Sequence, residues 1–233
     1  DTTNDDALLG AAWDDFCEQL KRAGRLPFRP GVPQGDLSRA EGFRTLAGNI
    51  GLALQFHLEN NDPLHPELIH YFNPIRKQGG DNPDSVYVGG PINGIDTYRI
   101  SGHRGTARYF AVTAVETGNT PWGGKVAHTL FGKDIRVEPD GSFELICSPH
   151  PHPGNWLRTT PDTFRVTFRQ FFADWENETP MQARIERLGD AAPPPVVDAP
   201  RLAEGLGVAA RWVGESVQYW ANMIEMWKAR PNT

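Results

Sequence analysis

The chain has 233 residues, of which 22% are charged and 39% hydrophobic, and its formal net charge at pH 7 is −6. This length can form one globular unit with a sizeable core, and no run reaches the roughly 20 apolar residues of a membrane-spanning helix. The acidic balance argues against a dedicated nucleic-acid-binding protein, because neutralising phosphates requires a surplus of Lys and Arg. Cys17 and Cys147 lie far apart in the chain, so we expect reduced thiols in a cytoplasmic protein rather than a disulfide framework.

The N-terminal segment, residues 1–78, is predicted to be helical. Apolar residues recur at helical spacing over residues 6–21. A capping box at Ser38–Glu41 predicts the start of a second helix. Asp62-Pro63 predicts a third, short helix that Pro74 would end.

From Gly79-Gly80 onward the sequence has the pattern of short β-strands. About eight β-prone segments are separated by turns rich in Gly, Asn and Asp. These segments are residues 85–89, 97–101, 109–115, 126–131, 135–138, 142–148, 164–172 and 182–188. So many short strands predict an α+β fold in which residues 79–190 form an antiparallel β-sandwich or jelly-roll core flanked by N-terminal and C-terminal helices.

The C-terminal segment, residues 191–233, combines a Pro-rich connector with a helix that Asp198 is expected to cap. The helix carries a broad apolar face that includes Trp220 and Trp227. Such a face is typical of core packing, and it could also wall a lipophilic pocket or serve as a docking face in a homo-oligomer. We expect the three segments to pack as one globular unit.

A loop after the predicted strand 142–148 concentrates residue types that are common at functional sites. His150 and His152 are two residues apart, which in an extended chain points both imidazoles to one side, as in the metal pair of cupin jelly rolls. The cupin carboxylate is missing, since Asn155 and Trp156 occupy its place. The neighbouring prolines favour a polyproline-like loop. Histidines that hydrogen-bond or face a cleft are therefore the favoured interpretation, with a metal pair as the alternative.

Asn82, Asp84 and Tyr87 surround the start of the first predicted strand. The simplest interpretation is a turn, because Asn and Asp side chains bond to their own backbone. The functional alternative makes Asp84 a general base or orienting carboxylate and Tyr87 a proton donor.

Arg169, Asp174 and Trp175 lie in and after the predicted strand 164–172. An arginine on an inward sheet face needs a carboxylate, and Asp84, Asp174 or Glu178 could provide it. This ion pair is favoured over an arginine that holds an anionic or carbonyl group of a ligand. Cys147 is expected to pack in the core, with a Cys147–His150 nucleophilic pair as the remote alternative.

Several of these motifs together resemble the DUF1214 family, which often accompanies a second uncharacterised domain, DUF1254. The resemblance covers residues 81–188, and the flanking helices resemble those of single-domain bacterial members. The motifs are Asn82-Pro83-Asp84 through Tyr87, the strand Tyr98 to Gly105, Asp140-Gly141-Ser142-Phe143, Gly154-Asn155-Trp156-Leu157 and Arg169-Gln170. The resemblance implies a β-sandwich or jelly-roll core and no settled activity. The chain departs from the family at Arg158, where the family usually has Pro.

From these patterns we expect an enzyme that needs no cofactor and acts by proton transfer on a small apolar metabolite of terpenoid or steroid type, such as a dehydratase, isomerase, cyclase or hydrolase. The expected acid and base groups are Asp84, His150, His152 and Tyr87. The expected substrate-binding residues are Asn82, Asn155, Trp156, Arg169, Asp174, Trp175 and Trp220. The alternatives are a non-catalytic module for ligand binding or assembly, and a metal-dependent jelly-roll enzyme that uses the histidine pair.

Overall fold

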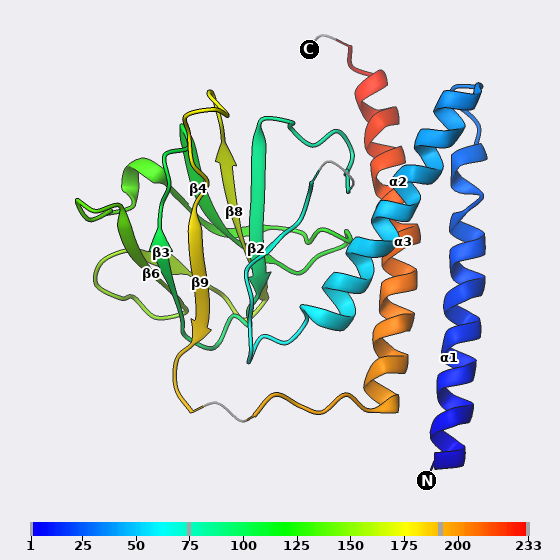
Figure 1. Cartoon of the computed structure of the whole chain (residues 1–233), viewed down its shortest axis with the longest axis horizontal. Coiled ribbons are helices and arrows are strands. Elements are labelled where there is room, and N and C mark those ends of the chain that lie inside the picture. Colours follow the sequence, from blue (N-terminus) through cyan, green and yellow to red (C-terminus); the bar gives the residue numbers. More distant parts are fainter. Residues whose placement is uncertain (1, 74–75, 191–192, 232–233) are drawn as a thin grey trace.

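The computed structural model describes residues 2–73, 76–190 and 193–231, and it combines a helical layer with a two-sheet β-sandwich (Figure 1). The expected α+β fold with a sandwich-like core is therefore confirmed. In chain order the elements are α1 (Thr2–Ala23), η1 (Leu26–Phe28), α2 (Asp36–Leu54), the π-helical turn η2 (Gln55–Glu59), β1 (Ile69–His70), β2 (Ser85–Pro91), β3 (Tyr98–His103), β4 (Tyr109–Glu116), β5 (Val126–Phe131), η3 (Gly132–Asp134), β6 (Ser142–Ser148), β7 (Trp156–Arg158), β8 (Thr163–Phe171), β9 (Gln182–Arg187) and α3 (Ala199–Lys228).

The strands form a five-stranded sheet, in the order β1-β2-β8-β4-β5, and a four-stranded sheet, in the order β7-β6-β3-β9. Neighbouring strands are antiparallel except for β6 and β7, which are parallel. In β8, Val166, Phe168 and Gln170 are fully buried between the sheets. Since side chains alternate along a strand, Arg165 and Arg169 lie on the opposite, outer face of the five-stranded sheet. This outer face becomes one wall of the site described below.

The helical layer packs beside that outer face, and α3 runs between α1 and the strands (Figure 1). Its core contains Phe16, Leu52, Phe56, Leu206 and Val213, with Tyr71, Tyr87 and Trp122 from the strand region packed against it. The predicted cap of α3 is confirmed, because a carboxylate oxygen of Asp198 accepts a hydrogen bond from the amide of Arg201 at 2.9 Å.

The predictions for the N-terminal segment need two corrections. The second helix begins at Asp36 instead of Ser38, and its N-cap Gly35 makes no side-chain capping bond. The third helix is wrong: the Asp62 side chain accepts a hydrogen bond from the amide of Leu64 at 2.9 Å and so forms a turn. The chain then extends into β1, which pairs with β2. Pro74, which was expected to end that helix, lies outside the described residues.

The strand predicted at residues 135–138 is also wrong. The Asn155 side chain accepts a hydrogen bond from the Arg136 amide at 2.7 Å and donates one to the Arg136 carbonyl at 2.8 Å. One amide side chain thus satisfies the backbone groups that a neighbouring strand would have paired. The sequence pattern also missed the short strand β7, which directly follows Asn155.

Candidate functional site

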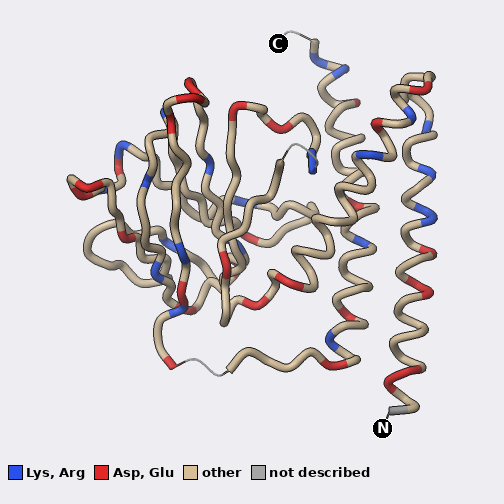
Figure 2. Tube along the Cα trace, viewed as in Figure 1, with Lys and Arg blue, Asp and Glu red and all other residues tan. Residues whose placement is uncertain are grey.

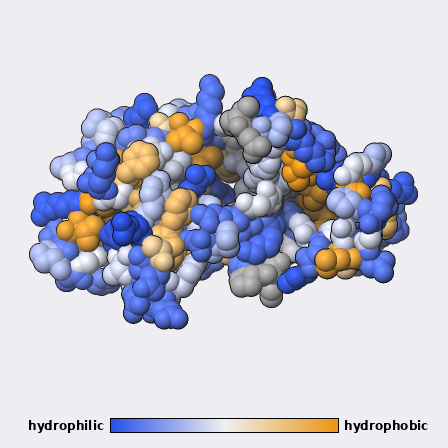
Figure 3. Space-filling model, turned by 90° about the horizontal axis from the view of Figure 1, so that it is seen from above, coloured by the Kyte–Doolittle hydropathy of each residue, from blue (hydrophilic) through white to orange (hydrophobic). Residues whose placement is uncertain are grey.

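A cavity of about 650 Å³ lies between the outer face of the five-stranded sheet and α3. In the space-filling view from above, the surface is hollowed between the sandwich and the helical layer (Figure 3). The walls come from η2, from the chain before β2, from the connection between β4 and β5, from β8 and from α3. Ten of the described lining residues are Phe, Tyr or Trp. The rings that meet edge to face include Phe56, Tyr71, Phe72, Tyr87, Trp122 and Trp212.

Local structure explains why these side chains converge. The π-helical turn η2 places two consecutive residues, Phe56 and His57, on the cavity, and such turns are common at functional sites. In β8 the strand alternation brings Arg165, Thr167 and Arg169 to the cavity side.

The connection between β4 and β5 reaches across from the sheet to α3 (Figure 1). A hydrogen bond holds it there: the indole N–H of Trp212 donates to the carbonyl of Pro121 at 2.9 Å. The next residue, Trp122, packs its ring 5.1 Å from that of Trp212 and 5.8 Å from that of Phe72, centroid to centroid. This connection therefore closes one side of the cavity with a tryptophan.

Gln78 fixes the opposite side through a buried polar network. Its amide donates to the Asn49 side chain at 2.5 Å, and its amide oxygen accepts from the Trp220 indole at 2.9 Å and from the Ser216 hydroxyl at 3.2 Å. Only 3% of Gln78 is exposed to solvent. Because each partner of this buried amide is itself held by α2 or α3, the network sets the position of Trp220 in the cavity wall.

Three residues that line the cavity each have a buried side-chain nitrogen with no hydrogen-bond partner in the described part of the chain. They are His57 Nε2, Trp122 Nε1 and Arg165 Nε. A buried donor without a partner costs about 1–3 kcal/mol, so native structures contain few of them. That three such residues belong to the lining of one cavity distinguishes this place from the rest of the described fold.

The Arg165 guanidinium lies over aromatic rings, with its carbon 4.0 Å from the centroid of Phe56 and 5.2 Å from that of Tyr71. None of the ion pairs formed within residues 2–73, 76–190 and 193–231 includes Arg165. Cation–π contacts are worth about 0.5–2 kcal/mol, which is no more than the cost of the unpaired N–H. Moreover, an aromatic ring attracts the face of a guanidinium, and the N–H groups at the edge of the guanidinium can still donate hydrogen bonds.

The ring of His57 is held neutral. Burial, assisted by the nearby charges of Arg165 and Arg211, lowers the pKa of His57 to about 4. At neutral pH this side chain therefore offers one N–H donor and one nitrogen acceptor without a charge.

Four of the residues predicted from the sequence line the cavity, namely Asn82, Tyr87, Arg169 and Trp220. Arg169 follows the predicted alternation, but its face is the outer one and its side chain is exposed. The expected ion pair of Arg169 with a carboxylate is wrong for the part of the chain that the structure describes, because its guanidinium instead lies 5.9 Å from the centroid of the Tyr87 ring.

Asp84, Asp174 and Trp175 lie outside this cavity. The Trp175 indole donates to the Asp84 carboxylate at 3.3 Å and its ring stacks on Phe172 with centroids 4.2 Å apart. Asp174 accepts hydrogen bonds from the backbone and side chain of Asn177 and so stabilises its own turn. The turn predicted before β2 is present, because the Asn82 side chain accepts a hydrogen bond from the amide of Asp84 at 2.9 Å.

The loop that contains His150 and His152 is on the surface, and both side chains are exposed. His152 Nδ1 lies 2.9 Å from the carbonyl oxygen of Pro153. Within the described ranges no group of three or more His, Cys, Asp and Glu side chains is placed to hold a metal ion.

Asn155 and Trp156 have structural partners. Asn155 bridges Arg136 and the carbonyl of Glu144 at the edge of an open, polar hollow on the four-stranded sheet. The Trp156 indole donates to the carbonyl of Ser148 at 3.1 Å. Cys147 is fully buried in the sandwich core, where burial raises the pKa of its thiol to about 12. The Cys147–His150 nucleophile is therefore wrong, because the thiol faces the core and the histidine faces solvent.

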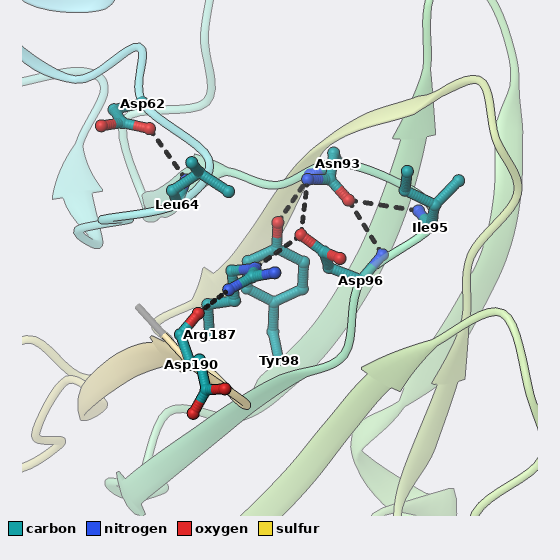
Figure 4. Close-up of polar contacts among 8 residues, drawn as sticks. All are labelled: Asp62, Leu64, Asn93, Ile95, Asp96, Tyr98, Arg187 and Asp190. Atoms are coloured by element: carbon teal, nitrogen blue, oxygen red, sulfur yellow. Dashed lines mark hydrogen bonds and ion pairs between the residues drawn. The ribbon is translucent and has the colours of Figure 1, made fainter. Parts of the chain in front are cut away.

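A second buried polar cluster, at the start of β3, is satisfied internally (Figure 4). The Tyr98 hydroxyl accepts from the amide of Asn93 at 2.9 Å, and the Arg187 guanidinium donates to Asp96 at 2.6 Å. Burial raises the pKa of Tyr98 to about 12, whereas the hydrogen bond from Arg187 lowers the pKa of Asp96. Since these groups have partners, the cluster holds the connection between β2 and β3 and offers no ligand site.

Sequence reasoning missed the residues that make the cavity distinctive. His57, Trp122 and Arg165 were not among the expected site residues, and Trp122 lies in a turn. Arg165 had a usable signal: it precedes Arg169 by four residues in a predicted strand, so both must share one face.

Residues 87–174 match the model of a family described as a protein of unknown function, DUF1214. An uncharacterized protein from Burkholderia cenocepacia has a similar solved structure, with 36% sequence identity and a TM-score of 0.88 over 97% of this chain. The chain spans 63% of the length of that protein. No curated protein matches the chain.

Two further solved structures are similar at a much lower level. The VPA0106 protein from Vibrio parahaemolyticus has 12% identity and a TM-score of 0.31, covering 55% of this chain and 31% of its own. An adhesin domain of Lys-gingipain from Porphyromonas gingivalis has 16% identity and a TM-score of 0.26, covering 52% of this chain and 70% of its own. These scores carry no argument about function. Across the described residues, no helix combines the length and the apolar character needed to cross a bilayer.

Proposed function

We propose, from the premise that residues 87–174 match the model of the DUF1214 family, that this protein binds a small, largely apolar molecule in the aromatic cavity between the five-stranded sheet and α3. The observation that carries the proposal is the construction of the cavity, which has aromatic walls and a few buried polar atoms that lack partners. Small-molecule sites typically occupy about 300–1,000 Å³ and combine apolar walls with a small number of polar groups. A volume of about 650 Å³ suits a molecule of terpenoid or steroid size.

Binding is favoured over acid–base catalysis by the titratable groups that line the cavity. Asp84, His150 and His152, the expected acid and base groups, are not among the lining residues. His57 is among them, but a base with a pKa of about 4 is a weak proton acceptor at neutral pH. Tyr87 contributes a hydroxyl to the wall. The carboxylate among the described lining residues, that of Asp81, is already paired with the Lys77 ammonium at 3.2 Å.

The proposal is tested with N-phenyl-1-naphthylamine, a neutral apolar probe whose fluorescence rises when it leaves water. We expect saturable binding and energy transfer from the cavity tryptophans. Thr113→Phe places a ring in the cavity from β4, so the affinity for the probe should fall about tenfold or more, because the probe and the new side chain compete for the same volume.

Ser101→Phe is the matched control, since it adds the same ring to the polar hollow on the four-stranded sheet. Its affinity for the probe should stay within about twofold of the original chain, a difference too small to represent a lost contact. Equal losses in the two variants, or no saturable binding by the original chain, would show that the cavity is not the binding site.

A further inference from the structure

We infer that the ligand of this cavity carries a carboxylate, and that Arg165, with the His57 imidazole and the Trp122 indole, holds it. The inference rests on the proposed function and specifies the chemical class of the ligand. Its basis is the set of three buried nitrogen atoms, His57 Nε2, Trp122 Nε1 and Arg165 Nε, which lack partners in the described part of the chain and belong to residues that line one cavity.

The chemistry of these three atoms selects an acceptor group on the ligand. The indole nitrogen can only donate, and so can the guanidinium nitrogen. The neutral imidazole donates when its proton is on Nε2, where no protein acceptor holds it. A carboxylate has two oxygens with about four acceptor positions, so one such group has enough acceptor positions for three donors.

The charges of the cavity wall select an anion in place of a neutral acceptor. The cationic side chains in the wall are Lys125, Arg165 and Arg169, and the wall contains one carboxylate, that of Asp81. Asp81 is occupied, because it bonds to the Lys77 ammonium at 3.2 Å and to the amide of Gln78 at 2.9 Å. Among the described lining residues the cations outnumber the carboxylates, so the charge balance of the wall favours a ligand anion over a ligand amine.

The arrangement of polar and apolar groups also fits a molecule with one charged end. Arg165 lies over Phe56 and Tyr71, at the part of the cavity where the aromatic rings meet. The rest of the wall continues along the rings of Phe72, Trp212 and Trp220. An aryl or alkyl carboxylic acid would place its carboxylate at Arg165 and its apolar body along these rings.

Isothermal titration calorimetry on the full chain tests the inference with two matched pairs of ligands. One pair is 1-naphthaleneacetate and 1-naphthaleneacetamide, and the other is decanoate and decanamide. Each amide keeps the carbonyl acceptor and the apolar body but lacks the charge. We expect at least one acid to bind about tenfold or more tightly than its amide, as hydrogen bonds to charged groups are stronger than those between neutral groups.

Variants assign the preference to the three nitrogen atoms. Arg165→Met should remove the difference between acid and amide while changing the affinity for the amide by less than about threefold, and Arg165→Lys should restore part of it through its charge alone. Trp122→Phe and His57→Phe keep an aromatic ring and remove one donor each, so each should weaken acid binding severalfold. Arg108→Met, at an exposed arginine before β4, is the control and should bind both ligands as the original chain does.

The outcomes separate the inference from the proposed function. Equal affinities for acid and amide in the original chain would overturn the carboxylate inference and leave apolar binding in place. Failure of all four ligands to bind would overturn both. An acid preference that persists unchanged in Arg165→Met and Arg165→Lys, with circular dichroism showing that both variants are folded, would place the carboxylate elsewhere and overturn the inference.

Discussion

Two arginines of the four-stranded sheet have carboxylate partners, whereas two arginines of the five-stranded sheet contact aromatic rings. On the four-stranded sheet, Arg99 pairs with Glu186 at 2.7 Å and Arg187 with Asp96 at 2.6 Å. On the outer face of the five-stranded sheet, Arg165 and Arg169 lie over aromatic rings instead. Ion pairs complete the hydrogen bonding of a guanidinium, whereas ring faces leave its edge available. This difference marks the cavity as the place where an additional acceptor fits.

His57 gives a prediction at the same scale, because the folded chain lowers its pKa from the ordinary 6.5 to about 4. As the pH falls through 6.5, the unfolded chain takes up the proton first, so the unfolded state is favoured. The contribution of the neutral ring is thus fully present above pH 6.5 and is lost between pH 6.5 and about 4. After allowance for partial exposure of the ring, the loss should be about 2 kcal/mol of unfolding free energy.

The measurement is urea unfolding at several pH values between 7 and 4 for the original chain and for His57→Phe. The variant should lose about 2 kcal/mol less stability over this range, because it has no imidazole to protonate. His103→Phe, at an exposed histidine in β3, should give a curve parallel to that of the original chain. Identical slopes for the original chain and His57→Phe would mean that the ring is not kept neutral by the fold.

At the scale of elements, the chain before β2 is fitted closely to α3. Gly79 has a positive φ of 54°, and a Cβ at this position would lie 2.1 Å from two atoms of the Trp220 ring. Gly80 also has a positive φ, 94°, but a Cβ there would meet no atom within 4 Å. Alanine variants at these two adjacent positions therefore distinguish the cost of backbone strain from the cost of a clash with the helix.

We predict that Gly79→Ala destabilises the protein more than Gly80→Ala. Both variants carry the cost of a left-handed backbone conformation, about 1 kcal/mol. Gly79→Ala must in addition displace Trp220 and weaken its hydrogen bond to Gln78, which should add about 1–3 kcal/mol. Chemical unfolding followed by circular dichroism gives both values, and equal losses would contradict the tight packing of this segment on Trp220.

The elements also show how far the sequence could predict the molecule. Strand alternation and turn residues identified most strands, and residue types identified the cap at Asp198. In β8 the strand was predicted, but Arg169 was expected on an inward face and lies on the outer one. These patterns could not predict that an Asn155 side chain would replace a strand partner for Arg136, because that bond joins residues 19 positions apart. The cavity could be predicted only in part. Tyr87 and Trp220 were candidates, but His57, Trp122 and Arg165 were not. Their side-chain nitrogens have no partner in the described part of the chain because of the tertiary packing, which the sequence pattern does not reveal.

At the scale of the whole molecule, the helical layer and the sandwich have separate apolar cores, and the cavity lies where they meet. Lys, Arg, Asp and Glu are interspersed along the whole chain (Figure 2). The contacts across the boundary are aromatic and polar, among them the Tyr71 hydroxyl, which lies 3.4 Å from the carbonyl oxygen of Val166. A ligand in the cavity would contact both layers and so connect them.

This arrangement predicts that a bound ligand stabilises both layers together. A ligand that binds only the folded chain adds about 2.7 kcal/mol at a concentration 100 times its Kd, which should raise the Tm of a protein of this size by roughly 5–10 °C. Hydrogen exchange near the midpoint, with 1-naphthaleneacetate at saturation, should slow in peptides from α3 and from β6 by similar factors, although β6 lies in the sheet that does not line the cavity. Slower exchange in α3 alone would show that the layers unfold independently, because the ligand would then stabilise the helical layer without stabilising the sandwich.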